Sequence, residues 1–125
     1  VSLDLQEGCN QGFLREDAVL LVVMVEAAVG YGPYNPLVWA DLVLEAKDFD
    51  HDRVAALGID HDWVESQPEP LCESGWTNQW PSGGEMWTQH FEHGIFGSIC
   101  VPSFGPYFAQ AAALAEELCA GAPQG

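Results

Sequence analysis

The sequence has very few basic residues. Arg15, Lys47 and Arg53 are its only arginines and lysines, against 19 acids, so the formal net charge is -16 over 125 residues. Nucleic acids and anionic membrane surfaces are bound through clustered cationic side chains. The charge therefore argues against both kinds of partner and favours a solvated acidic surface.

Long apolar runs are absent as well. None approaches the roughly 20 residues that cross a bilayer, so we expect no membrane insertion. The chain starts with VSLDLQEG, which has no Met, basic stretch or apolar stretch of a signal peptide. We interpret it as a piece of a longer chain. Its length and its 48% hydrophobic content predict one globular domain over 1–125.

The sequence also lacks the motifs of common catalytic and nucleotide sites. It contains no GxSxG, GxGxxG or phosphate-binding P-loop. This argues against nucleophilic catalysis and against nucleotide binding at such motifs.

The cysteines are four and widely spaced, with no CxxC pair, which argues against a zinc ribbon. An even count fits two disulfides in an oxidising compartment, and four buried free thiols are the alternative. Four cysteines allow three pairings, and the sequence does not choose among them. We expect Cys100–Cys119, which would tie a strand end to the last helix, and by elimination Cys9–Cys72.

Hydrophobic patterning predicts alternating strands and helices. The run DAVLLVVMV reads as a strand buried on both faces, and Asn35 and Pro36 are suited to cap and begin the helix that follows. Gly94 is predicted to stop the second helix, and Ser103 to cap the third. The order indicates an α/β fold with a doubly wound, mostly parallel sheet and helices on both faces. The expected strands are 17–25, 53–60 and 95–100, and the expected helices are 37–48, 84–94 and 105–119.

A long loop insertion is expected at 62–84, where Pro, Gly and Trp are frequent and no period is visible. Cys72 lies in its middle, which favours a loop pinned by a crosslink. Trp63, Trp76 and Trp80 are candidates for binding a partner, because exposed Trp is enriched at binding hot spots. The alternative is that they pack the loop onto the sheet.

Asp-His-Asp occurs twice, ten residues apart. Asp60, His61 and Asp62 follow a strand, where α/β proteins place their sites, and are weak metal candidates; turn and cap chemistry is the alternative. The first triplet, 50–52, precedes the same strand. It should lie roughly 20 Å away, so the two triplets are not expected to share an ion. His90 and His93 form an HxxH pair without an assigned third ligand.

Two segments carry a family resemblance: CNQGFLREDAVLLVVMV and GSICVPSFGPYFAQAAALAEELC. They resemble the C-terminal half of a von Willebrand factor type A domain, of the cysteine-containing variety on bacterial secreted or envelope proteins. The segment between them, NPLVWADLVLEAKDFDHDRVAALGI, also suits the family. The resemblance covers most of 9–119 and is poor across 62–90. It implies a doubly wound fold, an extracellular or periplasmic location, and binding rather than catalysis.

Many members of that family hold Mg²⁺ at a metal-ion-dependent adhesion site (MIDAS). The resemblance places the Asp of that site at Ala27, so the site is expected to be degenerate. Glu26 precedes it, but neighbouring strand residues point to opposite faces. The other ligands would lie upstream of residue 1, so Mg²⁺ or Ca²⁺ is expected only if an adhesion site is retained there; otherwise no cofactor is expected.

Three functions remain open at this point. The first is a secreted, disulfide-stabilised binding module with a protein or a neighbouring domain as its partner. The second is a structural part of a bacterial envelope protein. The third is a metal-dependent enzyme that uses Asp60, His61 and Asp62, or else the pair His90 and His93.

Overall fold

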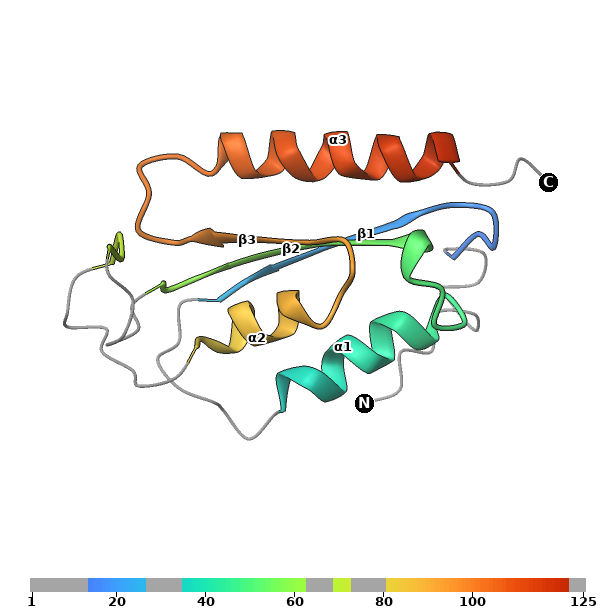
Figure 1. The fold of residues 1–125 in the computed structure, drawn as a ribbon, viewed down its shortest axis with the longest axis horizontal. Coiled ribbons are helices and arrows are strands. Elements are labelled where there is room, and N and C mark those ends of the chain that lie inside the picture. The colour runs from blue at the N-terminus through green and yellow to red at the C-terminus, as the bar shows by residue number, and fades with distance from the viewer. Residues whose placement is uncertain (1–13, 27–34, 63–68, 73–80, 122–125) are drawn as a thin grey trace.

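The protein is α/β, and the residues that the structure describes form a parallel sheet of three strands and three α-helices (Figure 1). The computed structural model describes residues 14–26, 35–62, 69–72 and 81–121. In chain order the elements are β1 (Leu20–Val25), α1 (Pro36–Glu45), the short 3₁₀ helix η2 (His51–Arg53), β2 (Val54–Asp60), α2 (Gly83–Gln89), β3 (Gly94–Ser98) and α3 (Gly105–Gly121).

The strand order is β1-β2-β3, and both pairings are parallel, with Val22 opposite Ala56 and Gly58 opposite Phe96. All seven residues of β2 are buried. The expectation that the first strand is buried on both faces is wrong. In the described part of the chain β1 lies at an edge, and its residues alternate between half-buried and exposed.

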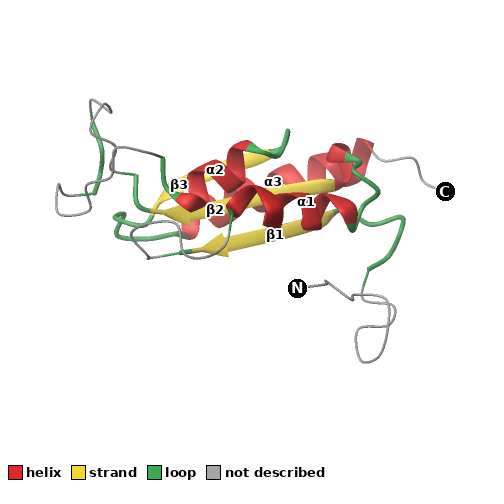
Figure 2. Cartoon of the chain, turned by 90° about the horizontal axis from the view of Figure 1, so that it is seen from below, coloured by secondary structure: helices red, strands yellow, loops and turns green. Residues whose placement is uncertain are grey.

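Helices cover both faces of the sheet, as in a doubly wound fold (Figures 1 and 2). Helices α1 and α2 lie on one face, and α3 lies on the other. Each face has its own apolar cluster. Leu44, Trp87 and Phe91 pack under α1 and α2, whereas Leu57 and Ile59 pack against α3. None of the helices within the described residues is both long and apolar enough to cross a membrane.

Local capping explains where two of the helices begin. The Asn35 side chain accepts a hydrogen bond from Leu37 N at 2.9 Å, and Pro36 occupies the first turn of α1, as predicted. Ser82 caps α2 by accepting from Glu85 N at 3.1 Å. The helix ends at Gln89, so the predicted stop at Gly94 is wrong: Gly94 begins β3.

The third helix begins where the sequence places it. The Ser103 hydroxyl accepts a hydrogen bond from Gly105 N at 3.3 Å. Helix α3 continues through Gly121 rather than ending before it. At its start Tyr107 covers Gly97, where an added Cβ would lie 2.5 Å from the Tyr107 ring. Only glycine allows this helix to pack so closely on β3.

One face of β1 is only partly covered. Leu21, Val23 and Val25 share the side of the sheet on which α3 lies, since Val23 is opposite Leu57 and Val25 is opposite Ile59. All three are exposed, Val25 to 55%. No strand among the described residues pairs with the outer edge of β1.

Candidate functional site

The strands all end at the same edge of the sheet, because they are parallel. Glu26 follows β1, Asp60 ends β2 and Ser98 ends β3, with Asp60 opposite Ser98. The amino end of α2 approaches this edge through Gly84. The carboxyl end of a parallel sheet is where α/β proteins place their sites, and polar groups gather here.

Asp60 is fully buried and holds the start of α2. Its two carboxylate oxygens accept hydrogen bonds from His61 N at 2.7 Å and from Gly84 N at 3.0 Å. A Cβ at Gly84 would lie 2.8 Å from the Asp60 Cβ, so this approach requires glycine. Asp60 therefore acts as an anchor between β2 and α2.

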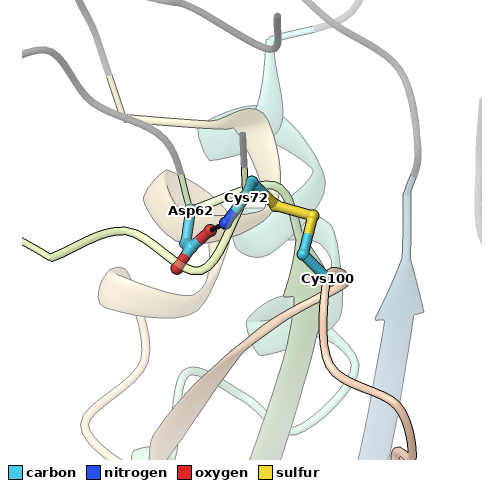
Figure 3. Close-up of side chains that lie close together, drawn as sticks. All are labelled: Asp62, Cys72 and Cys100. Carbon is cyan, nitrogen blue, oxygen red and sulfur yellow. Dashed lines mark hydrogen bonds between the residues drawn. A yellow bond between two sulfur atoms is a disulfide. The ribbon is translucent and has the colours of Figure 1, made fainter. Parts of the chain in front are cut away.

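Asp62 holds the loop at 69–72 in the same way. Its oxygens accept a hydrogen bond from Leu71 N at 2.7 Å and another from Cys72 N at 2.8 Å, which Figure 3 shows. The prediction of turn and cap chemistry therefore describes both carboxylates. His61, between them, is buried, with 1% of its surface exposed.

The disulfide at this edge joins Cys72 to Cys100 (Figure 3). The predicted pairs Cys100–Cys119 and Cys9–Cys72 are both wrong. Cys119 is free and exposed, because α3 carries it about 20 Å from the beginning of that helix, toward the other end of the sheet. Cys9 lies outside the described residues.

The Ser98 side chain supports the disulfide. Its hydroxyl oxygen accepts a hydrogen bond from Cys100 N at 3.1 Å and lies 3.6 Å from the Cys72 sulfur. The sulfurs of Cys72 and Cys100 and an oxygen of Asp62 lie within 4.8 Å of one another. Sulfurs joined in a disulfide are not thiolates, so the oxidised pair does not supply metal ligands.

Two further carboxyl groups are crowded at this edge. Burial raises the pKa of Glu26, and Asp60 raises it further, while His61 lowers it. Burial also raises the pKa of Glu85, with Asp62 and Asp60 acting in the same direction and His61 against them. The carboxyl end thus gathers four carboxyl groups on buried and half-buried residues.

Some of the residues at this edge could be predicted as site candidates from the sequence, and others could not. The structure unites Glu26, Asp60, His61 and Asp62 at one edge; Glu85 and Ser98 were not candidates. A sequence signal for Glu85 does exist: Ser82 and Glu85 form the Ser-x-x-Glu pattern of a capping box at the start of a helix. The partner-binding candidates Trp63, Trp76 and Trp80 lie outside the described residues, as does Ala27.

The amino end of the sheet differs from the carboxyl end in its charges. All three basic side chains lie there and line one surface hollow. Arg15 pairs with Asp17 at 2.7 Å, Lys47 donates to the Arg15 carbonyl, and Arg53 donates to the Glu16 carbonyl. Lys47 is buried, and burial and then Arg53 lower its pKa. Lys47 and Arg53 therefore hold the segment before β1 in place through its backbone carbonyls.

The HxxH pair does not converge on one point. His90 contacts Asp41 and His93 contacts Asp52, each at 2.8 Å between a ring nitrogen and a carboxylate oxygen. The first Asp-His-Asp triplet lies in and before η2, ahead of β2, and the second lies at the end of β2. The two triplets are thus at opposite ends of the sheet, as predicted.

Comparison with protein-family models, with curated proteins and with solved structures found no match.

Proposed function

We propose that this chain is a non-catalytic extracellular or periplasmic binding module, similar to the C-terminal half of a von Willebrand factor type A domain with a degenerate MIDAS. The observation that carries the proposal is the display of Leu71 at the carboxyl end of the sheet. Its side chain is 60% exposed on a backbone that is fixed on both sides.

The backbone at Leu71 is fixed by two separate restraints. The Asp62 carboxylate binds Leu71 N and Cys72 N, and Cys72 is crosslinked to Cys100 beyond β3. A binding surface gains affinity when its contact residues are already held in place, because less conformational entropy is lost on binding. An exposed apolar side chain on such a support suits contact with a protein partner.

The carboxylates at this edge support binding rather than catalysis. Asp60 and Asp62 together accept hydrogen bonds from four backbone N–H groups. A metal-dependent enzyme would need those oxygens for its ion, and freeing them would leave buried amides without acceptors. This use of the two acids also fits an adhesion site that no longer binds metal.

The disulfide supports the location. Bonds between cysteines persist in oxidising compartments and are rare in the cytosol. Cys72 and Cys100 are bonded across 28 positions of sequence, which fits a secreted or envelope protein.

A structural role within a larger envelope protein is the second candidate, and β1 favours it. Its outer edge has no partner strand in the described part of the chain, and Leu21, Val23 and Val25 are exposed beside it. Unpaired apolar edges are usually covered in native proteins. A neighbouring domain that adds a strand to β1 would cover both the edge and these side chains.

The binding proposal is tested by crosslinking in cells that naturally produce the protein. A photoreactive amino acid replaces Leu71 in one variant and Phe49 in the other. Phe49 is the matched control, because it is 56% exposed but lies near the amino end of the sheet. We expect a discrete crosslinked protein from position 71 and none from position 49. Equal crosslinking, or none from either site, would contradict the proposal.

The degenerate adhesion site is tested by calorimetric titration with Mg²⁺ and Ca²⁺. We expect no sub-micromolar binding, and no change in the Glu26→Gln variant. Tight binding that E26Q abolishes would contradict the proposal, because it would mean that a working metal site exists at the carboxyl end.

The structural alternative predicts a different result for Val23→Glu. If β1 is covered in a longer form of the protein, this change should destabilise the longer form much more than the 125-residue chain. Equal effects in both forms would remove that alternative.

A further inference from the structure

Side chains from two separate loops meet at the amino end of the sheet. Asp52 belongs to η2, whereas Glu92 and His93 belong to the turn between α2 and β3. One ligand atom from each of the three lies within 4.8 Å of the other two. Glu92 N also donates to His51 Nδ1 at 3.4 Å, which ties the two loops together.

We propose that Asp52, Glu92 and His93 form a surface site for a divalent transition-metal ion of the Zn²⁺ class. The set offers one imidazole nitrogen and two carboxylate groups. Zn²⁺ accepts both kinds of ligand, and imidazole favours it over Mg²⁺ and Ca²⁺, which prefer oxygen alone. Water would complete the coordination.

The distances between the three ligand atoms need to change only slightly for an ion to bind between them. Zinc bonds of about 2.0–2.2 Å place tetrahedral ligands about 3.3 Å apart. The His93 nitrogen and the Asp52 oxygen, now 2.8 Å apart, would separate slightly, and the Glu92 oxygen already lies within 4.8 Å of both. Asp52 is 80% exposed at its side chain, so its rotamer is free to adjust at little cost.

Electrostatics favours a cation at this place. The net charge of -16 raises the local concentration of cations around the protein. Arg53, the residue after Asp52, is engaged elsewhere: its guanidinium binds the Asp50 carboxylate and the Glu16 carbonyl. Arg53 therefore does not neutralise the Asp52 carboxylate, which can bind His93 and an ion.

The molecule supplies a matched control on the same surface. His90 and Asp41 make a contact of the same kind and length, 2.8 Å, and the Asp41 side chain is exposed as well, to 57%. Within the described residues, no third ligand joins them. The comparison is thus between the pair His90 and Asp41, which has no third ligand, and the pair His93 and Asp52, which has Glu92 beside it.

The experiment is a calorimetric Zn²⁺ titration of the full 125-residue chain, without an affinity tag and with free thiols alkylated so that cysteines do not bind the ion. We expect one site that His93→Gln and Asp52→Asn each weaken at least about tenfold. His90→Gln and Asp41→Asn should leave it unchanged. Co²⁺ absorption in the visible range should appear in the parent chain and be lost in H93Q.

The proposal is overturned if no binding occurs, or if H90Q weakens binding as much as H93Q. Circular dichroism of each variant shows that the fold is kept, which surface substitutions should not affect. This inference is separate from the proposed function, because it concerns the other end of the sheet. Binding lost in E26Q but retained in H93Q would contradict this site and, at the same time, the degenerate adhesion site.

Discussion

At the carboxyl end of the sheet Asp60 and Asp62 are buried and bind backbone amides. At the amino end the acids lie on the surface and pair with arginine or histidine side chains. Asp60 is fully buried and Asp62 is nearly so. Asp52, at the amino end, has a side chain that is 80% exposed. The only disulfide among the described residues also lies at the carboxyl end.

This difference separates residues that hold the fold from residues that are free to bind. A buried carboxylate that accepts two amide hydrogen bonds is costly to remove, because the amides are left without acceptors. An exposed ion pair contributes about 0–1 kcal/mol and can exchange its partner for an ion. We therefore expect stability to depend on the carboxyl end more than on the amino end.

The largest effect is expected from the disulfide. Replacing both Cys72 and Cys100 by Ser should lower the free energy of unfolding by about 3 kcal/mol, because a closed loop restricts the unfolded chain. The exposed Cys119→Ser variant is the control and should not change stability. Urea denaturation under non-reducing conditions measures both. Equal stability of all three proteins would show that the crosslink does not hold this end.

Removing the buried anchor should cost nearly as much. Asp60→Ala leaves the amides of His61 and Gly84 unsatisfied, and we expect a loss of about 2–3 kcal/mol. Asp50→Ala is the comparison at the amino end. Asp50 accepts from Asp52 N and pairs with Arg53 on the surface, so its loss should cost about 1 kcal/mol. If D60A does not fold, D60N, which keeps one carbonyl oxygen, should fold with reduced stability.

The two ends should respond to pH with opposite signs. Glu26 and Glu85 have pKa values above the ordinary 4.5 in the folded protein. They therefore bind protons more tightly when folded, and stability falls as the pH rises from about 4.5 through their folded pKa values. Asp17 has its pKa lowered by the hydrogen bond from Arg15, so its contribution is lost as the pH falls.

The corresponding variants separate these contributions. E26Q and E85Q should each be more stable than the parent at pH 7, by less than about 1 kcal/mol because solvent screens both groups. The gain should vanish below about pH 4. Thermal unfolding across this range measures it; a gain that persists at low pH would assign the effect to packing rather than charge.

The smallest effect is expected at Asp52. Without metal, Asp52→Asn should change stability by less than about 0.5 kcal/mol, because the side chain lies on the surface. With saturating Zn²⁺, the parent chain should unfold at a higher temperature while D52N shows a smaller shift. A large destabilisation of metal-free D52N would mean that this end also holds the fold.

Much of the fold could be predicted from the sequence because its signals are local. Asn35 and Pro36 begin α1 through contacts within one turn, and the strands follow from short apolar runs. The end of α2 was missed because His90, rather than Gly94, closes it. The burial of β1 was overestimated because an apolar run does not reveal whether a strand is central or at an edge.

The candidate site could be predicted only in part. The sequence placed Asp60 and Asp62 at a strand end, but not the amides that occupy them, since Gly84 and Leu71 arrive from later in the chain. It singled out Asp52 and His93 in separate motifs. That these two meet depends on the parallel pairing of β2 with β3.

The sequence by itself determined the element types, the acidic surface and the α/β class, because composition and periodicity act over a few residues. Only the tertiary structure decided which cysteines bond and which histidine finds a third ligand. Both depend on distances between segments far apart in the chain: Cys72 comes to Cys100 at one end of the sheet, while α3 carries Cys119 to the other.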